Sequence, residues 1–120
     1  MKVAITSTGK DLASPVDSRF GRAQYFIVVD TETGSHTVMD NSQNVNAMQG
    51  AGIQAAKNVS DTGARAVVTG NVGPKAFSAL NSAGIEIYTG ASGTVQDALD
   101  AYKAGSLKNA GKANVQGKWL

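Results

Sequence analysis

The stretch VVTGNVGP, residues Val67 to Pro74, decides the fold of this chain. It begins with β-branched apolar residues, which predict a buried strand, and continues into a turn that contains Gly70 and Gly73. Pro74 suits the first turn of a helix, because the N–H that proline lacks would be unpaired there. The stretch therefore predicts a strand–turn–helix unit whose turn offers free backbone N–H groups and the positive end of a helix dipole, an arrangement that attracts anions.

A second unit of the same kind follows in IYTGASGTVQDAL, residues Ile87 to Leu99. Thr94 with Asp97 three residues later has the pattern of a capping box, which predicts the start of the last helix. If the two strands are parallel neighbours, both glycine turns open at one edge of one sheet. Open α/β sheets usually hold ligands at such an edge.

Periodicity predicts five strands and three helices in the order βββαβαβα. The strands are expected over residues 2–7, 23–30, 36–40, 64–70 and 85–89, and two of the helices over 74–82 and 94–104. The first helix has a face of small and apolar residues, namely Met48, Ala51, Gly52, Ala55, Ala56 and Val59. An antiparallel start followed by right-handed crossovers gives an α/β fold with a five-stranded mixed sheet, the ribonuclease H-like layout.

The length of 120 residues is enough for one domain, which we expect over residues 1–104. The C-terminal tail, 105–120, lacks periodicity, and Trp119 is a candidate anchor within it. No apolar run approaches the roughly 20 residues that cross a bilayer, and the N-terminus reads directly into a strand. We therefore expect no membrane association and a cytoplasmic location.

Charge and composition restrict the chemistry. The net charge is +2 and aromatic residues make up 6% of the chain, whereas nucleic-acid binders usually show a dense basic face with stacking aromatics. The absence of cysteine excludes disulfides, thiol catalysis and thiolate-bound zinc or iron–sulfur centres. His36 stands without a second imidazole, which favours a surface strand residue over a metal ligand.

Four motifs, in order, resemble the dinitrogenase iron–molybdenum cofactor family. They are SRFGRAQYFIVVD (18–30), the asparagine-bearing loop leading into QGAGIQAAK (49–57), AVVTGNVGPKAFSAL (66–80) and AGIEIYTG (83–90). The family includes carriers and accessory proteins of nitrogenase cofactor assembly and the small orange proteins, which hold a molybdenum–copper sulfide cluster. With one domain and no cysteine, this chain is most similar to the orange-protein type.

The resemblance implies a protein that binds, stores or transfers an anionic molybdenum-containing metal–sulfide cluster non-covalently and is not an enzyme. The cargo would be a molybdenum–copper sulfide cluster or a related iron–molybdenum cofactor precursor, and delivery proteins are candidate partners. The cofactor-binding residues expected from the motifs and turns are Arg19, Phe20, Gly21, Arg22, Asn41, Asn44, Asn46, Met48, Gly70, Asn71, Val72, Gly73, Pro74, Gly90 and Ser92.

Several of these residues have a purely structural interpretation as well. Arg19 and Arg22 offer fork-shaped donors to an anion, but one of them could instead pair with Asp17. The amide-rich loop 41–46 could surround a cluster or simply form turns and caps. Met48 could offer a soft thioether, although its place in the apolar face of the helix favours the core.

Two further functions come into question, a nucleotide-binding one and a nuclease. The string G-x-G-x-x-A from Gly50 lies inside the predicted helix rather than after a strand, so we interpret it as close helix packing and not as a dinucleotide fingerprint. A ribonuclease H-like nuclease is the alternative function, and it would need converging carboxylates for two divalent cations. A small-anion or nucleotide sensor that uses the same turns is a further alternative.

Overall fold

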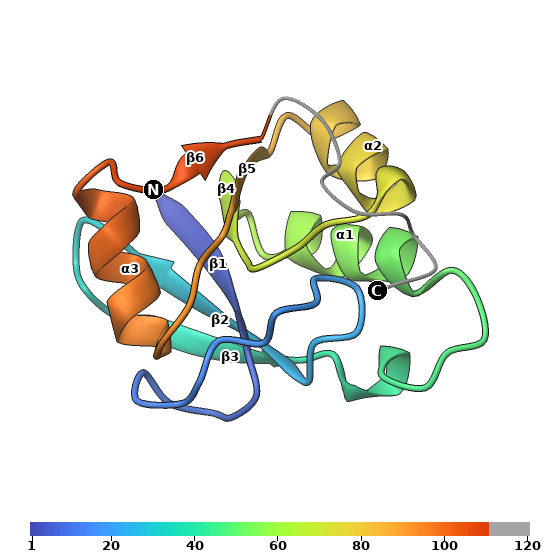
Figure 1. Ribbon diagram of the computed structural model, residues 1–120, viewed down its shortest axis with the longest axis horizontal. Coiled ribbons are helices and arrows are strands. Elements are labelled where there is room, and N and C mark those ends of the chain that lie inside the picture. The colour runs from blue at the N-terminus through green and yellow to red at the C-terminus, as the bar shows by residue number, and fades with distance from the viewer. Residues whose placement is uncertain (111–120) are drawn as a thin grey trace.

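The computed structural model describes residues 1–110 and shows a mixed sheet with helices on both faces (Figure 1). The strands follow the order β3-β2-β1-β4-β5-β6 across the sheet. The central strands β1, β4 and β5 run parallel, while β2 is antiparallel to β1, β3 to β2 and β6 to β5. The strand bounds are β1 Lys2–Ser7, β2 Tyr25–Asp30, β3 His36–Asp40, β4 Ala66–Val68, β5 Glu86–Thr89 and β6 Lys108–Asn109.

The helices are α1 (Ala51–Asp61), α2 (Pro74–Ser82) and α3 (Val95–Lys103), with a short 3-10 turn η1 at Ser42–Asn44. Helices α1 and α2 cover one face of the sheet and α3 covers the other (Figure 1). The interface under α1 and α2 buries aliphatic and aromatic side chains, and the interface under α3 buries aliphatic ones. Large apolar side chains contribute about 1.5–3 kcal/mol each when fully buried. No helix within residues 1–110 is long and apolar enough to cross a membrane.

The sequence predicted the local structure of the second half of the chain well. Helix α2 spans Pro74–Ser82 as expected, with proline in its first turn. The capping box of α3 is confirmed, because Thr94 accepts from the Asp97 backbone and the Asp97 carboxylate accepts from the Thr94 backbone. The mixed α/β architecture and its three helices are confirmed as well, whereas the ribonuclease H-like assignment stays a prediction.

The prediction of five strands was wrong, because the described chain has six. Strand β6 comes from the segment expected to be a tail, and the N–H of Ala110 donates to the carbonyl of Ile87 over 2.8 Å. Two residues are too few to show an alternating pattern, so only their pairing with the edge of β5 reveals the strand. The anchor expected at Trp119 lies outside the described residues.

Candidate functional site

The two glycine turns lie side by side, as the sequence predicted. Strands β4 and β5 are parallel neighbours, the N–H of Gly90 donates to the carbonyl of Gly70 over 3.0 Å, and that of Ala91 donates to Thr69 over 3.2 Å. Their surroundings differ, however. The turn that contains Gly90 and Ser92 leads into a segment covered by the loop before β2.

That loop binds the end of the second turn through its backbone. Val16 donates to the carbonyl of Gly93 over 2.9 Å, and Pro15 forms an isolated bridge with Thr94. Gly90 and Ser92 accordingly are not among the residues that line the pocket described next. The two turns share a sheet edge, but of the two only the first, through Gly73, contributes to this pocket.

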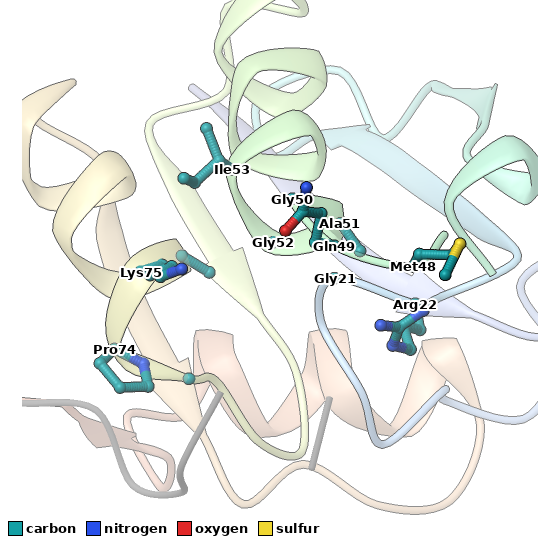
Figure 2. Close-up of a pocket in the computed structure, with 12 residues that line it drawn as sticks. Gly21, Arg22, Met48, Gln49, Gly50, Ala51, Gly52, Ile53, Pro74 and Lys75 are labelled. Atoms are coloured by element: carbon teal, nitrogen blue, oxygen red, sulfur yellow. The ribbon is translucent and has the colours of Figure 1, made fainter. Parts of the chain in front are cut away.

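A pocket of about 370 Å³ opens between the first turns of α1 and α2. Figure 2 shows Met48 and Arg22 on one side of it and Pro74 and Lys75 on the other, with the start of α1 between them. The lining residues come from three segments of the chain. They are Gly21, Arg22, Met48, Gln49, Gly50, Ala51, Gly52, Ile53, Gly73, Pro74, Lys75 and Ala76.

The electrostatic character of the pocket comes from two helix N-termini. Each helix has a glycine at its N-cap, Gly50 for α1 and Gly73 for α2, and neither N-cap forms a side-chain hydrogen bond. The first turns contain no acidic residue, and that of α2 carries Lys75. The leading N–H groups of a helix have no partner within it, so both helices direct donors and partial positive charge to this region.

Close packing of α1 on α2 brings these two N-termini together. A Cβ placed on Gly52 would lie 3.0 Å from the Cβ of Ala76, so a methyl group there would force the two helices apart by a few tenths of an ångström. The interpretation of the G-x-G-x-x-A string as close helix packing is therefore confirmed. Gly50 lies at the N-cap, just outside the helix in which it was predicted. The string follows the loop after β3 and not a strand, so it lacks the setting of a dinucleotide fingerprint.

Arg22 joins the pocket to the loop after β3. Its Nη1 donates to the carbonyls of Ala47 over 2.7 Å, Val45 over 3.2 Å and Asn44 over 3.5 Å, and the residue also lines the pocket. A guanidinium in contact with several carbonyls fixes the path of that loop, which leads to Met48. Arg22 thus has a structural role in addition to its place at the pocket.

Arg19 has a different environment. Its Nε lies 3.6 Å from the carboxylate of Asp17, and its side chain is 44% exposed. It does not line the pocket, and the pairing with Asp17 that the sequence left open is present. Phe20, between the two arginines, is fully buried and packs on Phe26 with ring centroids 5.3 Å apart.

Two of the predicted asparagines form a buried amide network. Asn41 donates to the carbonyls of Ala23 over 2.8 Å and Gly21 over 3.3 Å, and its Oδ1 accepts from Asn44 and Asn58. These side chains hold the loop that carries Arg22 against the loop after β3. Asn46 is exposed and does not line the pocket.

Of the predicted turn residues before α2, some attach the turn to another loop and others line the pocket. Gly70 packs on the backbone of Ser18, where a Cβ would lie 2.9 Å from both the Cα and the carbonyl oxygen. Asn71 donates to the Ser18 carbonyl over 3.2 Å, and Val72 is fully buried. These residues attach the turn to the loop before β2, while Gly73 and Pro74 reach the pocket.

Met48 lies far from the core, and the prediction that favoured burial was wrong: the residue is 98% exposed. The helix begins at Ala51, three residues later than the apolar pattern suggested, so Met48 belongs to the preceding loop. This later helix start explains why the first turn of α1 was not predicted as part of the site. Gly50 stands at the N-cap with φ +79°, a conformation that glycine adopts at little cost, and no side chain caps this helix start.

The pocket offers nitrogen donors and a thioether, but no thiolate. The chain has no cysteine, and within residues 1–110 no three His, Cys, Asp or Glu side chains gather closely enough to hold a metal ion. The converging carboxylates that a two-cation nuclease needs are thus not found in this part of the chain. Backbone N–H groups and side-chain cations suit an anionic guest.

The parallel central strands and the pocket at the helix N-termini place the chain in the class of small α/β proteins with an anion-compatible pocket. Within that class the profile of the dinitrogenase iron-molybdenum cofactor family matches residues 1–105, and the chain belongs to this family. The apo orange protein of Desulfovibrio gigas is 39% identical, with a TM-score of 0.92 over 95% of this chain and 96% of that one.

Two further proteins are similar over most of this chain. A Thermotoga protein provisionally described as NifB is 39% identical, with a TM-score of 0.84 over 97% of this chain and 98% of that one. An uncharacterized protein of Methanocaldococcus jannaschii is 28% identical over 105 residues, which cover 81% of this chain and 88% of that protein. The family and these neighbours indicate a role in binding or assembling a metal-containing cofactor of the nitrogenase type.

Proposed function

We propose that this protein binds an anionic molybdenum-containing metal–sulfide cluster non-covalently in the pocket between α1 and α2, and stores it or passes it on. The observation that carries the proposal is the convergence of two helix N-termini, both without a side-chain cap, beside Lys75 and Arg22. Backbone N–H groups and cations complement sulfido and oxo edges without a covalent bond. Hydrogen bonds to a charged group contribute on the order of 1.5–3 kcal/mol each, so a few of them suffice for useful affinity.

The thioether of Met48 gives the pocket one soft donor. Thioethers favour copper(I) among the common metal ions, and Met48 lies on the pocket wall with its side chain free of core packing. A molybdenum–copper sulfide cluster is therefore the cargo that we propose, with an iron–molybdenum cofactor precursor as the related case. Arg22 supports this arrangement because it fixes the loop that carries the methionine.

We propose a carrier or store rather than an enzyme. In this role the protein holds its cargo in the cytoplasm by charge and shape, and a delivery protein either loads the pocket or empties it. Weak donors suit such a role, because a cluster held by hydrogen bonds, cations and one thioether leaves more easily than one held by thiolate or imidazole ligands.

The experiment is reconstitution with tetrathiomolybdate and copper(I) under anaerobic conditions, followed by desalting. Visible charge-transfer bands and bound molybdenum and copper are then measured on the wild-type protein, on Lys75→Gln and on Lys57→Gln. Lys57 is the matched control, since it lies on α1 in an exposed ion pair with Asp61 and does not line the pocket.

We expect wild type and Lys57→Gln to retain the cluster and Lys75→Gln to lose a substantial part of it. If no bands survive desalting in the wild-type protein, the proposed cargo is wrong. Equal retention in all three proteins would show that the cluster binds elsewhere.

A further inference from the structure

Strand β3 ends the sheet in the described chain, and its outer edge has no neighbouring strand. It pairs on one side with β2, in a register that places Val38 opposite Ile27 and His36 opposite Val29. An edge strand leaves a row of backbone N–H and C=O groups that can pair with another strand. The side chains of β3, and the pattern in which its backbone groups alternate between β2 and the open edge, indicate which strand could pair with it.

The phase of the ladder shows which residues face outward. In an antiparallel pair, residues whose backbone groups bond to the partner alternate with residues whose groups point away. The backbone N–H of Asp30 donates to the carbonyl of Ser35 over 2.9 Å, and the N–H of Asn41 donates to the carbonyl of Gln24 over 2.9 Å. Every second residue between Ser35 and Asn41, namely Thr37 and Met39, is therefore bonded to β2. The backbone groups of the alternate residues, His36, Val38 and Asp40, therefore point to the open edge.

The side chains of these outward residues share one face of the sheet, because side chains alternate along a strand. The face is that of α3, since Ile27 and Val29 opposite them belong to the core cluster under α3. Helix α3 packs mainly on β1 and β4, and Val38 remains 40% exposed. The exposed Val38 side chain thus lies between the imidazole of His36 and the carboxylate of Asp40.

This order of side chains is complementary to itself. When two copies of β3 pair antiparallel about a two-fold axis at Val38, position i of one copy lies opposite position 76 − i of the other. His36 then faces Asp40 of the second copy on both sides of a central Val38 pair. The three outward residues also meet as hydrogen-bonded pairs, as the phase of the edge requires.

The charges fit this register. An imidazole can donate an N–H to a carboxylate whether it is neutral or protonated. Hydrogen bonds from Ser42 lower the pKa of the exposed Asp40 carboxyl, which keeps it ionised at neutral pH. Opposite charges across antiparallel strands stabilise the pairing, and like charges in the same positions destabilise it.

We propose that β3 is a self-association surface, through which two copies of this chain pair edge to edge in the register centred on Val38, with His36 of each copy against Asp40 of the other. The surface is short, so the dimer is a weak one that forms at high protein concentration. No residue of β3 lines the pocket between α1 and α2, and each copy keeps that pocket open. The inference is thus independent of the proposed cargo.

Sedimentation velocity of the full chain, from micromolar to low millimolar concentration, tests the proposal. We expect the wild-type sedimentation coefficient to rise with concentration. His36→Asp places carboxylates opposite each other twice per dimer and should lower the association constant at least about tenfold. The double change His36→Asp with Asp40→Lys should restore association, whereas Gln54→Glu on the exposed face of α1 adds a charge away from β3 and should leave it unchanged.

Amide protection measured by NMR locates the contact. We expect concentration-dependent protection at the outward amides of His36, Val38 and Asp40, while Thr37 and Met39, already bonded to β2, should change little. A wild-type protein that stays monomeric over the whole range would overturn the proposal. So would self-association that His36→Asp leaves intact or that protects amides elsewhere.

Discussion

Gly21 and Gly52 meet through bare backbone: a Cβ placed on Gly21 would lie 2.9 Å from both the Cα and the N of Gly52. The contact joins the loop that carries Arg22 to the first turn of α1. Gly52 in turn packs on Ala76 of α2, so three segments that are distant in sequence come together beside the pocket. The position of the two helix N-termini depends on the absence of side chains at these glycines.

The first prediction follows from that contact. Gly21→Ala should destabilise the protein by about 1–3 kcal/mol, because a methyl group that meets backbone atoms cannot be relieved by a rotamer change. It should also reduce cluster retention, since the loop of Arg22 must move away from α1. Urea denaturation measures the first effect and reconstitution the second, and unchanged values of both would contradict this account of the packing.

The two arginines provide a second prediction. Arg22→Gln should lower cluster retention more than Arg19→Gln, because Arg22 lines the pocket while Arg19 pairs with Asp17 outside it. The variants make the same chemical change at positions three residues apart, so each serves as control for the other. Molybdenum analysis after desalting decides, and an equal or larger loss in Arg19→Gln would place the anion beside Arg19, outside the pocket.

The amide network leads to a third prediction. Asn41→Ala should cost about 2–4 kcal/mol of unfolding free energy, because it leaves buried carbonyls and the amides of Asn44 and Asn58 without their partner. Asn46→Ala is the control and should change stability by less than about 0.5 kcal/mol, since that side chain is exposed. Denaturation midpoints at constant m-value compare the two variants, and similar losses would rule out the network as the cause.

The fourth prediction concerns Met48, whose replacement should change metal retention but not stability. Met48→Leu should leave the unfolding free energy within about 0.5 kcal/mol of wild type, because the side chain is almost fully exposed. It should nevertheless reduce the retained copper relative to molybdenum, since leucine offers no soft donor. Metal analysis of the desalted protein gives the ratio, and an unchanged ratio would exclude the thioether as a copper contact.

Residues close together in the sequence determined most of the secondary structure. Pro74 starts α2, the Thr94 and Asp97 pair starts α3, and the β-branched run before Gly70 forms a buried central strand. These signals act within one turn of helix or along one strand, where periodicity and capping chemistry leave few alternatives. The adjacency of the two glycine turns also followed, because parallel neighbouring strands bring their ends to one edge.

The tertiary structure alone decided which of the predicted side chains meet. Asn41 donates to the carbonyls of Gly21 and Ala23, which belong to a different loop. Met48 lies in a loop because α1 begins only at Ala51. Strand β6 exists because β5 offers it an edge. Such outcomes depend on close approach between distant segments, as at Gly21 and Gly52. The local sequence pattern does not determine which glycines will be in backbone contact.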